Sequence, residues 1–442
     1  MWFVILSLLM ISGCQTYEPQ FLDRNSHQAE WEARAPSSES VERFAERIGV
    51  GSSYEASFDA SDGLSLGEGQ RVALVFNPDL RVARLRAGVA KATAEYAGLW
   101  DDPQLSFDVL NITQNVPDPW LIGSALTFTI PVSGRLKVEK ARAEAEMYAE
   151  LERVAEAEWE TLRDVVHSWL DWSADGYRLR ETEVTLEKLN SVVATTSRLA
   201  EAGELFRTEA ALFSIEQASR NTERDRLATA MEEEEQQIRS LMGLSPSAPL
   251  ELVATLSAGP VSTRQKEPNE NHPTLARLRR EHEVADQALL REIRKQYPDV
   301  TIGPQAESDE GQSRIGFIGA IPVPILNSNK GGIAEARAER EVALAAYETE
   351  YERMVGRLAV LHARLRGVRS RLNTVRRTLV PLVDRQVADA DQLLELGEGD
   401  SLVLLNSLVR SNEAKLQLID LYLEEAQVKN EIRYLLGPDG WK

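Results

Sequence analysis

The chain has very few of the residues that build disulfide or metal frameworks. Its 442 residues include one cysteine, Cys14, and five histidines. An intrachain disulfide is therefore excluded, and a thiolate or multi-histidine metal site is not expected. Fifty basic residues against seventy acidic ones leave a net charge of −20. Because such a surface repels a phosphate backbone, nucleic acid is not an expected partner.

Long apolar runs are also scarce. Residues 2–13 are uncharged and mostly apolar, but this stretch is too short to cross a hydrocarbon core of roughly 30 Å as a helix. It predicts a signal peptide over residues 1–13 rather than a spanning helix. No other stretch has the ~18 consecutive apolar residues that a transmembrane helix needs. If this protein crosses a membrane, we expect strands to do so.

The apolar stretch ends in Ile11-Ser12-Gly13-Cys14. This segment resembles the lipobox of bacterial lipoproteins, in which small residues precede a cysteine that receives a diacylglycerol. The resemblance implies lipidation of Cys14, and Gln15 rather than aspartate after it favours the outer membrane. The alternative is a buried apolar start with an incidental cysteine. We expect residues 14–63 to form a lipid-anchored, extended N-terminal segment.

An internal duplication organises the rest of the chain. Short motifs recur 195 residues apart, and after the middle of each copy the offset becomes 194. The matching motifs are Asn77-Pro78-Asp79-Leu80 with His272-Pro273-Thr274-Leu275, Ala141-Arg142-Ala143-Glu144 with Ala336-Arg337-Ala338-Glu339, and Leu241-Met242-Gly243 with Leu435-Leu436-Gly437. The offsets predict a first repeat at 64–245, a linker at 246–267, a second repeat at 268–437 and a tail at 438–442.

Each repeat has the same predicted order of elements: a helix, two strands, and then a very long helical pattern. The helices are expected at 80–98 and 275–296, and the strands near 103–112, 122–131, 298–306 and 314–322, with a polar loop at 307–314. Alternating apolar residues indicate strands with one apolar side. Pairing should stop at Pro131 and Pro322, because proline cannot donate to a ladder.

The long helical pattern of the first repeat carries a heptad seam that includes Leu162, Val165 and Trp169. The stretch from Gly134 to Gly203 predicts a helix of roughly 100 Å, longer than a globular domain needs. A coiled-coil rod would explain the heptads. It would leave the signal peptide and the amphipathic strands unexplained.

The duplication, the lipobox and three segments together resemble the TolC-like outer-membrane efflux proteins. The segments are LSLGEGQRVALVFNPDL at 64–80, IPVSGRLKVEKARA at 130–143 and IPVPILNSNKGGIAEARA at 321–338. The resemblance covers residues 64–437. Family members have Leu-x-Leu-Glu-Glu-Ala before the Asn-Pro, whereas Gly67 and Gly69 stand here, so the start of the first helix is the point where this chain departs from the pattern.

The resemblance implies a mainly α fold with a small β part, in which duplicated long-helix hairpins join four strands per protomer. Three protomers would form a 12-stranded outer-membrane barrel continued by a periplasmic helical barrel. Four strands alone cannot close a barrel, and lipid tolerates no open sheet edge, so other chains must complete the sheet. The side chains expected to face lipid are Leu126, Phe128, Ile130, Phe317 and Ile321, with Ser106, Asp108, Thr127 and Thr129 in the lumen. A register slip of one residue would reverse these faces.

Lone glycines at matching positions interrupt the two long helical patterns, and a glycine can close a helix in the left-handed conformation. The resemblance implies that these turns form a periplasmic aperture that docks on an adaptor protein. The plainer interpretation is two ordinary helical-hairpin turns. The docking residues so predicted are Gly203, Glu204, Leu205, Gly397, Glu398 and Gly399.

The sequence offers little for catalysis. Gly67 and Gly69 lack the third glycine and the preceding strand of a phosphate loop, and His167 and His362 lie in helical patterns without a nucleophile to activate. We therefore expect no enzymatic activity, cofactor or resident metal. The function that follows is a passive, lipid-anchored exit channel working with a periplasmic adaptor and an inner-membrane pump, in efflux or type I secretion. The alternative is a periplasmic coiled-coil scaffold or adaptor lipoprotein without a barrel, and the cargo is open between metal ions, drugs and polypeptides.

Overall fold

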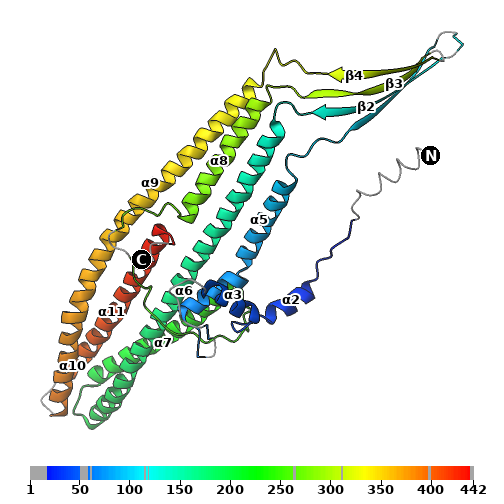
Figure 1. Ribbon diagram of the computed structural model, residues 1–442. Helices are drawn as coiled ribbons and strands as arrows, with labels where there is room; N and C mark the ends of the chain where they lie inside the picture. Colours follow the sequence, from blue (N-terminus) through cyan, green and yellow to red (C-terminus); the bar gives the residue numbers. More distant parts are fainter. Residues whose placement is uncertain are drawn as a thin grey trace.

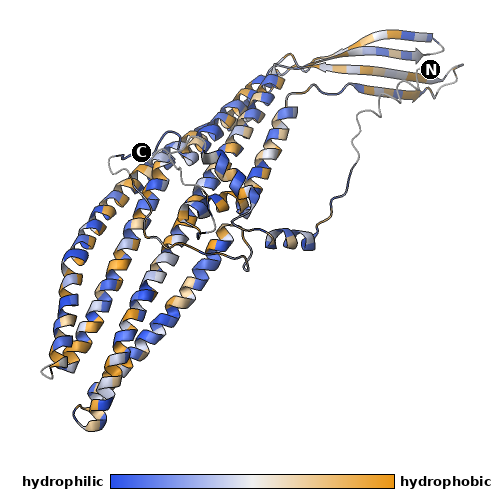
Figure 2. Ribbon diagram, turned by 60° about the horizontal axis from the view of Figure 1, so that its bottom comes forward, coloured by the Kyte–Doolittle hydropathy of each residue, from blue (hydrophilic) through white to orange (hydrophobic). Residues whose placement is uncertain are grey.

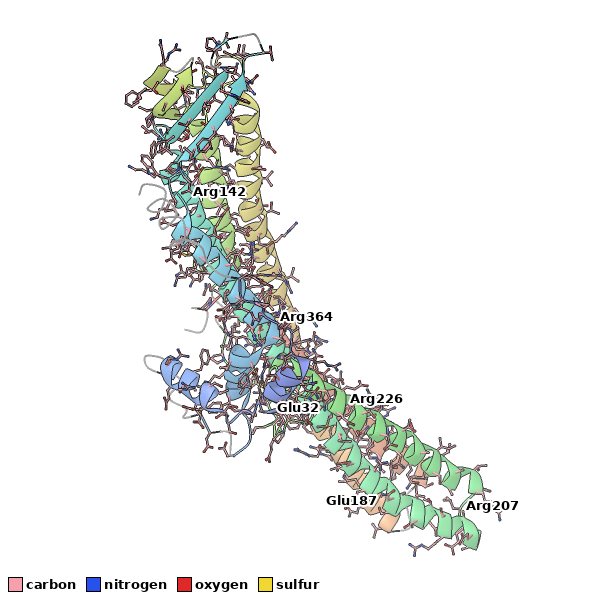
Figure 3. The ribbon with its side chains drawn as sticks, turned by 90° about the vertical axis from the view of Figure 1, so that its right-hand side faces the viewer. Glu32, Arg142, Glu187, Arg207, Arg226 and Arg364 are labelled. Carbon is pink, nitrogen blue, oxygen red and sulfur yellow. The ribbon has the colours of Figure 1, made fainter. Side chains whose placement is uncertain are left out.

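The computed structural model describes residues 17–49, 58–59, 62–113, 116–117, 119–261, 265–309, 312–396 and 400–438. The signal peptide, Cys14 and the second predicted tip, Gly397 to Gly399, lie outside these residues. The described chain is elongated, with a small sheet at one end and two helical-hairpin tips at the other (Figure 1). Figure 3 shows that the helical layer bends between these ends near Arg364, and that Arg207 lies at one tip.

The first repeat begins with two short helices, α4 (Leu66–Phe76) and α5 (Pro78–Tyr96). The hairpin β1 (Gln104–Asn111) and β2 (Trp120–Ile130) follows. Next come α6 (Arg135–Ala202), 68 residues long, and α7 (Arg207–Leu241). The predicted long helix is thus confirmed, and its seam residues Val165 and Trp169 are fully buried.

The second repeat has the same order. It contains α8 (Pro273–Arg294), β3 (Val300–Asp309), β4 (Gln312–Ala320) and α9 (Lys330–Thr374). A five-residue π-helical turn, η1 (Val375–Leu379), then leads into α10 (Val380–Glu395) and α11 (Ser401–Leu436). Helices α5 and α8 each begin at the proline of their X-Pro pair, where the missing N–H costs nothing. They begin and end two residues earlier than predicted.

The four strands form one antiparallel sheet in the order β1-β2-β3-β4. The residue numbers of partners add to 231 in the first hairpin, as in Gln104 with Thr127, and to 621 in the second, as in Thr301 with Ala320. The difference is twice the 195-residue offset, so the two hairpins share one register. Pairing ends at Ile130 and Ala320, before the two prolines, as predicted.

The polar stretch 307–314 is not the loop that the sequence suggested. Glu307 pairs with Arg314 and Ser308 with Ser313, so β3 and β4 continue almost to the tip of their hairpin. Polar side chains are compatible with a strand when one side of the sheet is hydrophilic. The sequence-based interpretation was wrong because it took polarity for a turn.

The helices form a layer that follows the order of the strands. Helix α5 packs on α6, α6 on α8, and α8 on α9, so α5 and α9 lie at the two edges of the layer (Figure 1). In the half that leads to the tips, α6 packs on α7 and α11, and α10 on α11. Within the described residues, no helix combines the length and apolar character that a membrane span requires.

Helix α4 forms despite its two glycines. Ser65 and Glu68 make a reciprocal capping box at its start, which satisfies backbone N–H groups that otherwise have no partner. Gly69 has a packing role, because a Cβ there would lie 2.5 Å from the ring of Trp169. The glycine that departs from the family pattern therefore makes room for a buried indole in the core with Val72 and Met242.

The segment before the first repeat is not simply extended. It contains α2 (Arg24–Glu32), capped by Asp23, and α3 (Glu39–Gly49). Trp31 and Arg34 each donate a hydrogen bond to the carbonyl of Gly243, at 3.2 and 3.0 Å. The expectation of an extended segment was wrong, because the Asp23 cap and the hydrogen bonds to Gly243 stabilise helical structure here.

The segment between the repeats packs closely on the helices. Leu64 and Leu252 form a parallel bridge, and the Trp169 indole donates a hydrogen bond of 3.0 Å to the carbonyl of Val253. Ala248 and Ala258 are buried. Ala258 packs in one core cluster with Val166 of α6 and Ala426 of α11, so this segment contacts both repeats.

Candidate functional site

The sheet has one apolar face. Because partners in an antiparallel ladder point to the same side, the observed register groups the side chains of all four strands. The apolar face carries Leu105, Phe107, Val109, Ile122, Leu126, Phe128, Ile130, Val300, Ile302, Ile315 and Phe317. Phe317 is 84% exposed and Ile315 is 88% exposed in the single chain. Such a large exposed apolar surface indicates contact with lipid or another chain.

The other face of the sheet is mainly polar. Ser106, Asp108, Thr127, Thr129, Gln305, Glu307 and Arg314 share it. The Asp108 carboxylate lies over Gly123, where a Cβ would be 2.4 Å from its oxygen. Bands of polar and apolar residues alternate along the strands in Figure 2. The structure thus places the predicted lipid-facing residues of the strands on one side and the predicted lumen residues on the other.

An ion-pair cluster joins the sheet to the helices. Arg135, at the start of α6, donates from Nε to Asp299 at 2.6 Å and from Nη2 to Asp101 at 2.5 Å. Ser133 donates to the same Asp299 at 3.0 Å. The hydrogen bond to Asp299 is the largest cause of a raised pKa at Arg135. Sequence reasoning missed this cluster, although Asp101 stands just before one predicted strand and Asp299 at the start of another.

A second polar joint links the two ends of the second repeat. His272 caps α8, where its Nδ1 accepts a hydrogen bond from the Thr274 N–H at 3.2 Å and its Nε2 lies 2.9 Å from the carbonyl oxygen of Tyr434. The Trp159 indole of α6 donates to the same carbonyl at 2.9 Å. Burial lowers the pKa of His272, and burial with the nearby Glu160 raises the pKa of Tyr434 to about 12. Because Nδ1 accepts the Thr274 N–H, this cap needs an imidazole that is unprotonated at Nδ1.

The helical tips enclose a groove of about 610 Å³. It lies between the first repeat's α6–α7 turn and the second repeat's α10 and α11, and two of the predicted docking residues, Glu204 and Leu205, line it. Its charged lining residues are all acidic: Glu204, Glu209, Asp391 and Asp400. Sequence reasoning missed the two aspartates and Glu209, because only the packing of the tips brings the two repeats together.

Gly203 closes α6 in the left-handed conformation, with φ of 77°. Its N–H and that of Glu204 bond back to the carbonyls of Ala200 and Leu199, which satisfies the end of the helix. A Cβ at Gly203 would meet no atom within 4 Å. The glycine is therefore required by backbone conformation and not by crowding.

The residues considered for chemistry do not converge. His167 is exposed and lies 3.5 Å from Asp171, one turn away on α6, whereas the His362 ring nitrogen lies 3.1 Å from the carbonyl oxygen of Gln265. Over the residues that the structure describes, no group of three or more histidine, cysteine, aspartate or glutamate side chains could hold a metal ion.

Residues 71–244 match the family model described as outer membrane efflux protein. The resemblance seen in the sequence is confirmed.

The chain is 25% identical over 247 residues to the cobalt-zinc-cadmium resistance protein CzcC of Cupriavidus metallidurans, an alignment that covers 54% of this chain and 59% of the relative. The chain thus matches about three fifths of that relative's length.

Two solved structures establish the fold over most of the chain. The outer membrane protein VceC of Vibrio cholerae is 17% identical, with a TM-score of 0.72 and coverage of 84% of this chain and 96% of that chain. CusC is 15% identical, with a TM-score of 0.72 and coverage of 95% and 99%. The predicted fold class, mainly helical with four antiparallel strands, is confirmed.

Proposed function

We propose that this protein is a passive outer-membrane exit channel of a tripartite efflux system, with type I secretion as the related possibility. The observation that carries the proposal is the sheet at the end of a long helical layer. It has one apolar face, one polar face and, within the described part of the chain, two edges without a partner strand. The chain does no chemistry and provides a path across the outer membrane and part of the periplasm.

The sheet edges support assembly as a homotrimer. Strands β1 and β4 each have one side without a partner strand among the residues that the structure describes, and a sheet can lie in lipid only when every edge is paired. Three copies would supply twelve strands, an even number of the kind found in outer-membrane barrels. The apolar face, with Leu126, Phe128, Ile130 and Phe317, would then contact lipid, as would Ile321 just beyond β4.

The acidic groove supports docking of a periplasmic adaptor at the tips. The lining carboxylates of Glu204, Glu209, Asp391 and Asp400 favour a partner that presents basic side chains. Gly203 and Leu205 belong to the same turn, and Gly397, Glu398 and Gly399 stand at the equivalent place in the sequence of the second repeat. The adaptor would connect the channel to an inner-membrane pump.

The lipobox supports a lipid anchor at Cys14. The expected result of Cys14→Ser is loss of palmitate labelling and accumulation of an uncleaved precursor, because serine cannot form the thioether to lipid. Membrane assembly should persist, since the strands rather than one lipid chain supply most of the membrane contact. Undiminished palmitate incorporation in this variant would refute the anchor.

Divalent metal ions are the first cargo to test. The relative in Cupriavidus metallidurans is named for resistance to cobalt, zinc and cadmium, and the net charge of −20 per chain suits a path for cations. Cells that lack this chain should accumulate these metals and regain resistance when it is restored. Unchanged metal tolerance with raised drug sensitivity would assign the channel a different cargo.

The channel itself is tested with the purified full-length chain in planar lipid bilayers. We expect stepwise, cation-selective conductance from a species that runs as a trimer in native electrophoresis. The alternative, a periplasmic scaffold without a barrel, predicts a chain that yields no conductance and releases from the outer membrane when the lipid anchor is removed. The Cys14→Ser variant therefore separates the two proposals.

A further inference from the structure

The two repeats contact each other inside one chain, and this contact predicts how one copy meets the next. Helix α6 of the first repeat packs on α8 and α11 of the second repeat. If the repeats alternate around a ring, α9 must meet α5 and α7 of the neighbouring copy in the equivalent way. The duplication offsets, 195 up to the tips and 194 beyond them, then assign each contact residue its counterpart.

The first counterpart pair carries complementary charge. Inside the chain, Arg153 of α6 bonds to Glu281 of α8 with an Nη2 to Oε1 distance of 2.8 Å. The equivalent positions are Glu348 on α9 and Arg86 on α5, so the signs are exchanged while the attraction is kept. Both side chains are exposed, and neither has an ion-pair or hydrogen-bond partner among the described residues.

A second pair follows from the same rule nearer the tips. The side chain of Gln427 on α11 donates to Asp171 on α6 at 2.7 Å. The equivalent positions are Glu233 on α7 and Arg366 on α9, again exposed and without a side-chain partner within the described part of the chain. Arg364, two residues earlier, forms an ion pair with α11 of its own chain. Arg366 therefore differs from Arg364 in having no side-chain partner among the described residues.

At a third position, a cation–π contact inside the chain corresponds to an apolar pair between copies. Arg280 of α8 lies over the ring of Tyr148 of α6, 5.2 Å from its centroid. The equivalent positions are Leu85 on α5 and Ala343 on α9. Leu85 is 63% exposed in the single chain. Both of these equivalent residues are apolar, so they too can pack together across the interface.

We propose that α9 of one copy packs against α5 and α7 of the next in this register, with ion pairs Glu348–Arg86 and Arg366–Glu233 across the interface. The contact is head-to-tail: the two surfaces lie on opposite edges of the helical layer, so successive copies close a ring. This inference rests on the proposed trimeric channel and adds the residues through which its helical part assembles.

The register is tested by cross-linking the full-length chain in cells. Arg86→Cys combined with Glu348→Cys should give covalent dimers and trimers with a short bis-maleimide, and so should Glu233→Cys combined with Arg366→Cys. A spacer is needed because long paired side chains hold their Cα atoms too far apart for a disulfide. The ladder should stop at three chains.

Arg86→Cys with Arg337→Cys is the matched control. Residue 337 stands on the same helix, three turns from Glu348, about 16 Å along the axis. The proposed register predicts no cross-link for this pair. The parent chain, with Cys14 alone, provides the blank.

Charge reversal gives an independent readout. Arg86→Glu and Glu348→Arg should each lower the yield of native trimer several-fold, and the double variant should restore it. Trimers that link Arg337 rather than Glu348 to Arg86, or a double variant that is not rescued, would overturn the register and leave the channel proposal standing. A parent chain that forms no trimer would overturn both.

Discussion

The first repeat caps the helix before its hairpin with Asn77, and the second repeat caps the equivalent helix with His272. Asn77 accepts from the Leu80 N–H at 3.1 Å and donates to the carbonyl of Leu241 at 2.9 Å. His272 performs both tasks with its two ring nitrogens, at 3.2 and 2.9 Å. The fold therefore requires an acceptor and a donor at this joint, while the residue type is free to differ.

At the start of the long helix, too, the two repeats share a geometry but differ in residue type. Gly134 and Asn329 occupy equivalent positions before α6 and α9, and both adopt the left-handed conformation, with φ of 72° and 51°. Glycine does so without a Cβ penalty. Asn329 instead gains two hydrogen bonds of 2.8 Å from its Nδ2 to Glu292. One backbone geometry is thus reached by two chemical routes.

The largest expected effect tests whether both hairpins present the same face to lipid. Phe128→Arg in the first repeat and Phe317→Arg in the second should each cost roughly 2–4 kcal/mol per copy near the membrane midplane, because a charge enters lipid. The yield of outer-membrane trimer, measured by native electrophoresis, should collapse for both. Thr127→Arg, one residue away on the polar face, is the control and should assemble; equal behaviour of residues 127 and 128 would contradict the assigned faces.

The next effect compares the glycines that follow α7 and α11. Gly243 has φ of 66°, and a Cβ there would lie 2.0 Å from the carbonyl oxygen of Phe76; Gly437 has φ of 88°, but its Cβ would lie 3.3 Å from His272. Gly243→Ala should cost about 3 kcal/mol or more, from overpacking and backbone strain together. Gly437→Ala should cost about 1–3 kcal/mol, mainly from strain, because its φ of 88° and ψ of −179° lie in a region that residues other than glycine rarely adopt.

Circular dichroism melting of the purified chain measures this difference. The melting temperature should fall further for Gly243→Ala than for Gly437→Ala. The reverse order would show that the joint of the second repeat is the tighter one. Gly67→Ala, where a Cβ would meet nothing within 4 Å, serves as a control that should not lower stability.

A smaller stability effect is expected at the tips, together with a larger effect on the partner. Gly203→Val should cost about 1 kcal/mol or more through its positive φ, and the trimer should still assemble and insert. Export should fall, and cross-links from cysteine at Glu204 to an adaptor should vanish. The same tests at Gly397 and Glu398 compare the second tip. Normal export by the valine variants, with no cross-link from either cysteine in the parent, would remove these turns from the docking site.

The smallest effect concerns pH. Because burial lowers the pKa of His272 below its ordinary value of about 6.5, the unfolded chain binds the proton more readily than the folded chain. Stability should therefore fall as pH drops below about 6.5 and should not depend on this group above it. The hydrogen bond with the Tyr434 carbonyl opposes the shift, as do Glu156 and Glu350, so the effect should be small.

Exchanging the two capping residues isolates the contribution of His272 to the loss of stability in acid. His272→Asn should keep the cap, as Asn77 does, and should flatten the fall in melting temperature between pH 6.5 and pH 5. Asn77→His should steepen it. If His272→Asn leaves the pH profile unchanged, other groups control the acid sensitivity.

Three features of the fold could be predicted from the sequence alone. The 195-residue offset predicted two equivalent units, the period of two in the strands predicted an amphipathic sheet, and the spacing from Gly134 to Gly203 predicted one continuous helix. Each of these features is local or repeated, so it leaves a pattern that can be read along the chain.

Only the tertiary structure decided which distant residues meet. The register that places Phe128 opposite Ile302, the bond of Arg135 to Asp299, the place that Gly69 leaves for Trp169, and the acidic groove shared by Glu204 and Asp400 all join segments far apart in sequence. Such contacts depend on how helices pack side by side, and a shift of one residue in a strand would exchange its two faces. The sequence specifies these contacts through the packing of the whole molecule, and no local pattern reveals them.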